Sequence, residues 1–105
     1  MPDLKKMLDL AVSAAAEAGA ALKAHRADWG VIEEEQGREV KIQADKKAEA
    51  LILKALAVTP YPIISEEAGW VRAAEAGERD VWAVDPLDGS VNYLRDYPHC
   101  AVSIA

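Results

Sequence analysis

A chain of 105 residues with 51% hydrophobic and 29% charged residues has the length and composition of one soluble globular domain rather than of a disordered segment. Its net charge of −6 argues against binding to nucleic acid or to an anionic membrane, since both attract clustered lysines and arginines. Cys100 is the single cysteine, no run of about 18 apolar residues could span a bilayer, and the N-terminus does not resemble a signal peptide, so we expect a cytoplasmic protein without disulfides.

Apolar residues recur at intervals of three and four near the start of the chain, which predicts a long amphipathic helix over residues 2–27. Asp28, Trp29 and Gly30 follow as its end. Most of its buried face is alanine, so the helix can lie close to the layer that it covers. The residues with this spacing are Leu4, Met7, Leu8, Ala11, Ala14, Ala15, Ala18 and Leu22.

The next residues predict a hairpin and a second helix. The polar run 33–38 is interpreted as the tip of a hairpin between two short strands, with its charges in solvent rather than in a binding site. A second helix is predicted over residues 44–56, with Asp45 in its first turn and Pro60 just beyond its end.

Three short apolar runs predict strands at residues 61–65, 81–84 and 101–105. The resulting fold class is α+β, a largely antiparallel sheet covered by two helices, and we expect a single domain over residues 1–105. The last six residues form an apolar strand with no charge and no turn after it. We therefore expect either that another chain pairs with this edge or that the sequence is the front part of a longer protein.

Two carboxylates stand where an apolar run near the end of the chain stops. Asp85 ends the run, and Asp88 follows three positions later, with a proline between them to fix the backbone. Oxygen-only ligands favour Mg²⁺ or Ca²⁺. Gly89 and Ser90 come next and can offer N–H groups and a hydroxyl to an anion. The pattern predicts a site for a hard cation and a phosphate.

A second group of carboxylates, Glu66 and Glu67, follows another predicted strand. If the two strands pair side by side, these residues meet Asp85 and Asp88, and three or four carboxylates around one point repel one another unless a divalent cation neutralises them. Each candidate also has a simpler interpretation. An aspartate after a strand is often a turn former or a helix cap, and the two glutamates alone suit a solvated loop. Asp45 alone is a favourable charge at a helix N-terminus.

Three stretches together resemble the inositol monophosphatase family: residues 64–67 (Ile-Ser-Glu-Glu), residues 82–93 (Trp-Ala-Val-Asp-Pro-Leu-Asp-Gly-Ser-Val-Asn-Tyr) and residues 97–105. The resemblance covers the whole chain in order but only the N-terminal part of the family, well under half of a full-length member. It implies an αβαβα layered fold and a Mg²⁺-dependent, lithium-sensitive phosphatase. The family's substrates are inositol monophosphates, fructose 1,6-bisphosphate and phosphoadenosine phosphates, and a homodimer is also implied.

The resemblance assigns metal ligands by position. It implies that Glu66 binds the first Mg²⁺, that Asp85 bridges two ions and that Asp88 holds the second ion. The carbonyl of Leu87 would complete the first site. The ions would lower the pKa of a bound water, orient it in line and stabilise the leaving oxygen.

The resemblance also assigns the phosphate contacts and the catalytic hydroxyl. Gly89 and Ser90 would meet the phosphate through their backbone N–H groups, and Asp45 would orient the Ser90 hydroxyl, which helps to position the attacking water. Two residues depart from the family pattern, which usually has threonine where Ser90 and Ile42 stand. The family's C-terminal domain, which supplies another aspartate and most substrate contacts, lies beyond the matched part.

We therefore expect a Mg²⁺-dependent phosphomonoesterase of small sugar or inositol phosphates, present here as an N-terminal part that on its own can be inactive. The alternative is a catalytically inactive metal-binding or interaction module that pairs with another chain through its exposed sheet edge. A calcium-binding protein is less favoured because no loop follows the EF-hand spacing.

Overall fold

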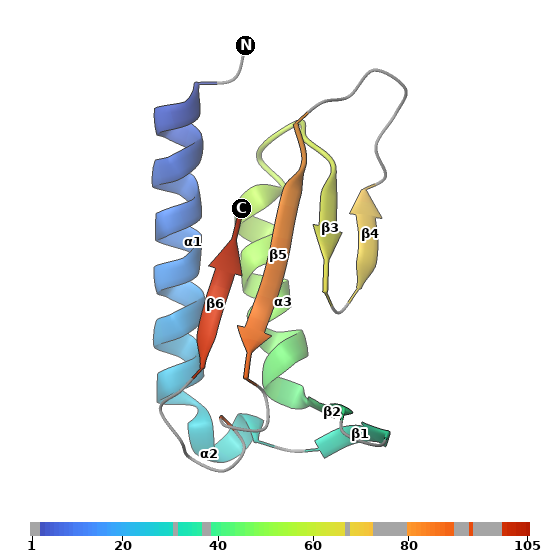
Figure 1. Ribbon diagram of the computed structural model, residues 1–105. Coiled ribbons are helices and arrows are strands. Elements are labelled where there is room, and N and C mark those ends of the chain that lie inside the picture. Colours follow the sequence, from blue (N-terminus) through green and yellow to red (C-terminus); the bar gives the residue numbers. More distant parts are fainter. Residues whose placement is uncertain are drawn as a thin grey trace.

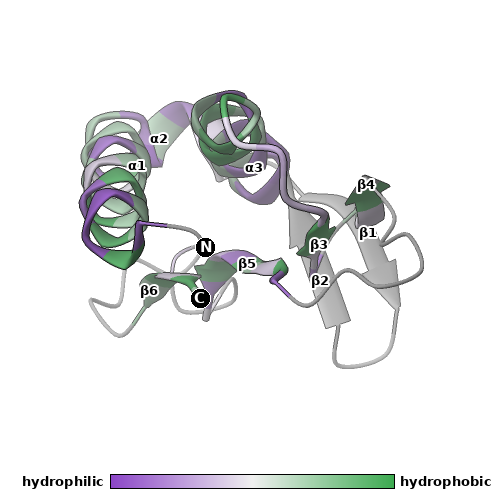
Figure 2. Cartoon of the chain, turned by 90° about the horizontal axis from the view of Figure 1, so that it is seen from above, coloured by the Kyte–Doolittle hydropathy of each residue, from purple (hydrophilic) through white to green (hydrophobic). Residues whose placement is uncertain are grey.

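The computed structural model describes residues 3–30, 32–36, 39–66, 68–72, 80–89, 93 and 100–105. Two long helices cover one face of a four-stranded sheet, and a separate two-stranded sheet lies at one end of the molecule (Figure 1). Seen from above, α1 (Leu4–Ala24) and α3 (Gln43–Leu56) lie side by side over the same face of the larger sheet (Figure 2). The predicted α+β class, with two helices over one sheet, is confirmed.

The start of α1 is defined by a side-chain cap. The Asp3 carboxylate accepts a hydrogen bond of 3.2 Å from the backbone N–H of Lys6, which satisfies one of the N–H groups that have no partner within the helix. The buried face of the helix is formed by small residues, as predicted, and consists of Ala14, Ala18 and Leu22. Because these side chains are short, α1 packs closely against α3.

The predicted helix over residues 2–27 is wrong at its C-terminal end. The first helix stops at Ala24, and a short second helix, α2 (Arg26–Trp29), follows it. His25 separates them because its backbone, with φ −105° and ψ 20°, leaves the helical range. Gly30 ends α2, close to the predicted end of the helical region.

The predicted hairpin is confirmed, although its turn is shorter than expected. Strands β1 (Ile32–Gln36) and β2 (Glu39–Ile42) pair antiparallel, so residues 33–36 belong to the first strand and not to the tip. Residues 37 and 38 lie outside the described residues. Helix α3 follows β2 directly and agrees within one residue with the predicted helix over 44–56.

The larger sheet has the strand order β4-β3-β5-β6. Its strands are β3 (Ile63–Ser65), β4 (Gly69–Arg72), β5 (Trp82–Asp88) and β6 (Ala101–Ile104). Strand β3 pairs antiparallel with β4 but parallel with β5, and β5 pairs antiparallel with β6. The sheet is therefore mixed, with antiparallel pairs predominating as expected. The parallel pair brings the C-terminal ends of β3 and β5 to the same edge.

Two strands differ from their sequence predictions. Strand β5 was expected to stop at residue 84, but it continues through Pro86 to Asp88 because a bulge in its pairing with β6 accommodates the proline. Strand β4 was not predicted, since Gly69–Arg72 is short and half polar. Strand β3 begins two residues later than the predicted 61–65.

The core between helices and sheet is largely apolar and includes a buried chain of polar contacts. Ile52 and Leu56 of α3 are fully buried against Ile63 and Trp82. The Trp82 indole N–H donates to the Thr59 hydroxyl at 2.9 Å, and that hydroxyl donates to the Leu56 carbonyl at 2.8 Å. Among the described residues, no helix combines the length and the hydropathy that crossing a bilayer requires.

Candidate functional site

The parallel pairing of β3 and β5 places two candidate ligands next to each other. Ser65 is opposite Val84 in the ladder, and the Glu66 N–H donates to the Val84 carbonyl at 2.8 Å. Glu66 therefore follows the end of β3 beside Asp85 on the neighbouring strand. From the sequence, these residues were expected to meet if the two strands paired side by side, and the structure shows that β3 and β5 do pair.

Glu66 and Asp85 line one open groove of about 440 Å³ on the sheet face away from the helices. Glu66 is exposed, and Asp85 is half-buried. None of the described lining residues is basic, so nothing among them offsets the two negative charges. The remaining lining residues are Ile64, Ser65, Gly69, Ala83, Val84, Ser103 and Ala105.

A bulge in β5 brings Asp88 to the same face as Asp85. Residues three apart on a regular strand point to opposite faces. Here Asp85 is opposite Ser103 and Asp88 is opposite Ala101, so three steps along β5 match two steps along β6. Burial agrees, because Pro86 and the residue after it are both buried whereas Asp88 is exposed. Asp88 does not line the groove that Glu66 and Asp85 share.

Of the three or four carboxylates predicted to converge, the described residues bring two, Glu66 and Asp85, into one groove. In the part of the chain that the structure describes, no three acidic, histidine or cysteine side chains gather closely enough to hold an ion. The pair fits a hard divalent cation in the type of its donors, which are carboxylate oxygens, and in its uncompensated charge. Glu67 lies outside the described residues, and so does Ser90.

Leu87, assigned to the first ion, and Asp88, assigned to the second, lie at the C-terminal end of β5. The Leu87 side chain is buried with Ala44 and Ala48 of α3, which places this helix turn beneath the strand end. Asp45 stands between these two alanines in sequence and is itself 1% exposed. It is thus a buried carboxylate in the first turn of α3, close to the strand end but not in the groove.

Gly89 turns the chain away from the sheet. Its φ of 89° lies in the left-handed region, which a residue without a Cβ atom adopts without strain. Its carbonyl accepts a hydrogen bond of 3.0 Å from the Tyr93 N–H. The position of the Gly89 carbonyl therefore depends on where Tyr93 is held.

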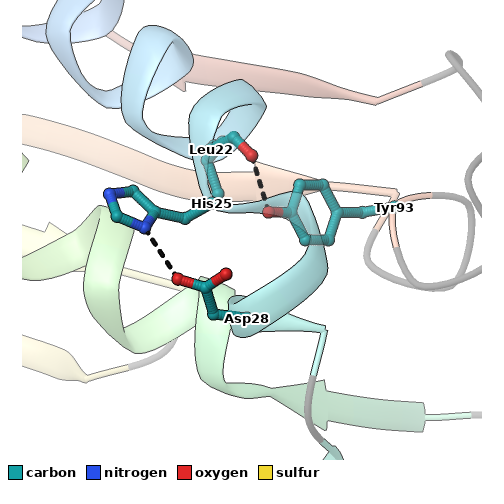
Figure 3. Close-up of polar contacts among 4 residues, drawn as sticks. All are labelled: Leu22, His25, Asp28 and Tyr93. Atoms are coloured by element: carbon teal, nitrogen blue, oxygen red, sulfur yellow. Dashed lines mark hydrogen bonds and ion pairs between the residues drawn. The ribbon is translucent and has the colours of Figure 1, made fainter.

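Tyr93 is anchored by the C-terminal turn of α1 (Figure 3). Its hydroxyl donates to the Leu22 carbonyl at 2.7 Å, and the Arg26 guanidinium lies over its ring at 5.0 Å from the centroid. Burial raises the pKa of the Tyr93 phenol above its usual value, although Arg26 acts in the opposite direction. The nearby α2 turn is held by His25, whose Nδ1 lies 3.0 Å from the Asp28 carboxylate and whose ring stacks on Trp29 with centroids 4.4 Å apart.

Sequence reasoning missed one polar contact beside the groove. The Ser65 hydroxyl donates to the Glu49 carboxylate at 2.6 Å and so joins β3 to α3. Glu49 follows Asp45 by four residues, which places two carboxylates on one side of a helix that is otherwise apolar there. That spacing is the signal that could have drawn attention to Glu49.

The sequence model described as "Inositol monophosphatase family" matches residues 3–105. The chain belongs to the inositol monophosphatase family. The resemblance inferred from the motifs after β3 and within β5 is confirmed, as is its restriction to the N-terminal part of the family.

Two relatives show how much of a full-length sequence is matched. The protein named "Nus factor SuhB" of Pseudomonas aeruginosa is 34% identical over 106 residues, which cover 97% of this chain and 39% of that protein. The "Inositol-1-monophosphatase" of Synechocystis sp. is 34% identical over 108 residues, which cover 97% of this chain and 36% of that protein. The chain therefore spans less than two fifths of the length of these curated relatives.

The fold agrees with a solved structure of the same family. The extragenic suppressor protein suhB from Bartonella henselae superposes with a TM-score of 0.84 and 29% sequence identity. The match covers 95% of this chain and 40% of that chain. The two covering helices and the mixed sheet are therefore the family's arrangement over its matched part.

Proposed function

We propose that this chain carries the metal-binding part of a Mg²⁺-dependent phosphomonoesterase that hydrolyses small sugar or inositol phosphates. One observation supports this function above others: Glu66 and Asp85, from neighbouring parallel strands, line the same groove. Two carboxylates so placed offer oxygen ligands to a divalent cation, which would compensate their charge. A phosphate ester is itself an anion, so it can approach this acidic groove only when a cation is present.

The metal ligands in this proposal are the residues at and after the two strand ends. Glu66 and Asp85 would hold one ion together with the Leu87 carbonyl, and Asp85 would share a second ion with Asp88. The bound Mg²⁺ would supply an activated water and neutralise charge on the phosphoryl group. The role of the protein is to hold the carboxylates still, which β3 and β5 do through their ladder.

The phosphate and the attacking group would be positioned at the turn that follows β5. Gly89 and Ser90 would donate backbone N–H groups to the phosphate. Asp45, buried in the first turn of α3, would accept a hydrogen bond from the Ser90 hydroxyl and so orient it. The left-handed φ of Gly89 lets the chain turn there without a side chain that would exclude the phosphate.

Phosphate release tests this proposal. The purified chain is incubated with inositol 1-phosphate and with p-nitrophenyl phosphate, with Mg²⁺ or with EDTA. We expect release of phosphate only with Mg²⁺, and we expect the Asp88→Asn variant to lower kcat/KM by about 100-fold, the scale on which one charged transition-state contact acts. Asp80→Asn is the matched control, because Asp80 is an exposed carboxylate just before the other end of β5.

Two results would contradict the proposal. Phosphate release that is unaffected by EDTA would remove the metal from the reaction. Equal activity of Asp88→Asn and Asp80→Asn would remove the assigned ligand. Retained Mg²⁺ affinity without any turnover would instead support a second function.

The second candidate function is a non-catalytic interaction module that pairs with another chain through a sheet edge. The edge expected from the sequence is β6, which is the last strand in the sheet order. The opposite edge, β4, exposes Trp70 and Val71, which are 51% and 44% accessible. Relatives carry the name Nus factor SuhB, which is not the name of an enzyme. If the chain is an interaction module, replacing Trp70 with Lys would abolish its association with a partner or a second copy. If the chain is a phosphomonoesterase, the same replacement would leave phosphate release unchanged.

Location and assembly are proposed on the same basis. A cytoplasmic location suits a chain with one cysteine and no internal disulfide. A homodimer suits the exposed apolar residues of β4. Sedimentation of the purified chain at several concentrations tests the dimer, which a concentration-independent monomer mass would contradict.

A further inference from the structure

We propose that Glu49 is a positioning residue that, through Ser65, holds the end of β3 so that the Glu66 carboxylate faces Asp85. This inference rests on the proposed function, because it concerns a residue proposed as a metal ligand. Glu49 contacts neither metal nor substrate in this role. It acts on the other side of the sheet, through a hydrogen bond between two layers of the fold.

The hydrogen bond itself is short and shielded. The Ser65 hydroxyl lies 2.6 Å from Glu49 Oε2, within the range of bonds from a hydroxyl to an ionised carboxylate. Ser65 is only 3% exposed, and Glu49 is half-buried. Water therefore competes poorly for the Ser65 hydroxyl. The two residues are 16 positions apart, so the bond joins helix α3 to strand β3 rather than stabilising either element alone.

Because side chains alternate between the two faces of β3, the contact that holds Ser65 also constrains the direction of Glu66. Burial along the strand runs buried, exposed, buried from Ile63 to Ser65, and Glu66 is exposed again. Ser65 therefore points to the helix layer, and the next side chain points to the groove. Fixing the Ser65 side chain fixes the backbone from which the Glu66 carboxylate extends.

A second anchor acts on the same short segment. The Glu66 N–H donates to the Val84 carbonyl at 2.8 Å, and Ser65 is opposite Gly69 in the ladder with β4. Gly69, with a φ of 70°, closes this tight hairpin. Strand β3 has only three residues, so its end has few ladder bonds of its own. The Glu49 contact is the tertiary bond that holds this end to the helix layer.

The first experiment measures whether the anchor acts on Glu66 in the absence of metal. Hydrogen exchange of single backbone amides is followed by NMR in the wild-type chain and in the Ser65→Ala, Glu49→Ala and Glu49→Gln variants. We expect exchange of the Glu66 amide to accelerate about tenfold or more in both alanine variants, since a bond to a charged group is lost. Glu49→Gln keeps an acceptor for the hydroxyl, so it should restore most of the protection.

Two controls separate positioning from general loss of stability. The Trp82 N–H, which donates to the Pro62 carbonyl at 2.9 Å, reports on the opposite end of the same ladder and should be unaffected by the alanine variants. Thr59→Val removes two other buried hydroxyl bonds, to the Trp82 indole and to the Leu56 carbonyl, and should accelerate exchange of the Glu66 amide no more than that of the Trp82 amide. Equal acceleration of both amides in Ser65→Ala would overturn the proposal.

The second experiment measures metal affinity directly. Mn²⁺, as a probe for the Mg²⁺ site, is titrated by calorimetry into the wild-type chain and the same variants. We expect Ser65→Ala and Glu49→Ala each to weaken binding about tenfold, and the double variant to be no weaker than either single variant, since both remove one bond. Thr59→Val should bind Mn²⁺ as the wild type does.

The outcomes distinguish this inference from the function on which it rests. If the wild-type chain binds Mn²⁺ and the alanine variants bind it with the same affinity, the role of Glu49 is overturned. The proposed phosphatase function would be unaffected by that result. No Mn²⁺ binding by the wild-type chain would overturn both. Additive losses in the double variant would show that Ser65 and Glu49 act separately, which also contradicts the proposal.

Discussion

The Tyr93 hydroxyl donates a hydrogen bond of 2.7 Å to the Leu22 carbonyl, and so joins two residues that are 71 positions apart (Figure 3). Leu22 is in the last turn of α1, where carbonyl groups have no N–H partner within the helix. The bond therefore satisfies a helix end and, through the Tyr93 N–H, also holds the Gly89 carbonyl at the end of β5. One side chain connects the first helix to the proposed phosphate-binding turn.

Tyr93→Phe should lower the free energy of unfolding by about 1 to 3 kcal/mol, because the Leu22 carbonyl would be left buried without its donor. Unfolding in urea, followed by tryptophan fluorescence, measures the change. Tyr61→Phe is the control, since Tyr61 is half-buried and its hydroxyl has no hydrogen-bond partner among the described residues. Equal losses in both variants would contradict a specific role for the Tyr93 hydroxyl.

The same residue predicts a dependence of stability on alkaline pH. Burial raises the pKa of Tyr93 above its usual 10.0, so the folded state retains the phenol proton more tightly than the unfolded state. The stability that this group contributes is fully present below about pH 10 and decreases as the pH rises through the raised value. Urea unfolding between about pH 8 and about pH 11 should show a steeper loss for the wild type than for Tyr93→Phe. Parallel curves for the two proteins would contradict this prediction.

Close packing of the helices predicts the effect of a larger side chain. Ala18 of α1 is fully buried against the core residues Ile52 and Leu56. Ala18→Leu should therefore destabilise the fold by about 1 to 3 kcal/mol through overpacking. Ala20→Leu, on the exposed side of the same helix, should change stability by less than about 0.5 kcal/mol. Thermal unfolding of both variants measures the difference, and similar melting temperatures would contradict the observed packing.

Removing one carboxylate of the groove should have opposite effects without and with metal. Asp85→Asn removes one of the two negative charges of the groove, so without Mg²⁺ it should leave the melting temperature unchanged or slightly raised. With Mg²⁺ at about 100 times its dissociation constant, the wild type should gain about 2.7 kcal/mol and the variant much less. Asp80→Asn should respond to Mg²⁺ as the wild type does. An equal gain in all three proteins would remove the ion from this groove.

The elements that follow a simple periodicity were predictable from the sequence. Helix α3 agrees with its prediction because Ala44, Ala48 and Ile52 recur at helical spacing and face the core. The ends of elements were less predictable. The break at His25 depends on one backbone conformation, and nothing in the apolar pattern of the first helix signals it.

The sequence proposed residues for the candidate site, but only part of their arrangement could be inferred from it. That Glu66 and Asp85 would meet followed from two strand ends that pair side by side. The bulge that turns Asp88 to the same face follows from the register of β5 with β6, which no local pattern reveals. The same is true of the Ser65–Glu49 contact, because it joins two elements whose relative position is set by tertiary packing.

The extra residue in β5 has a consequence for anyone who transplants this pair of aspartates to another scaffold. On a flat, uninterrupted strand, a spacing of three would send one carboxylate into the protein interior. A designer must then shorten the interval to two positions or copy the irregularity around Pro86 with it. The geometry comes from the bulged segment of β5 together with its partner strand β6, and the two aspartates alone do not reproduce it.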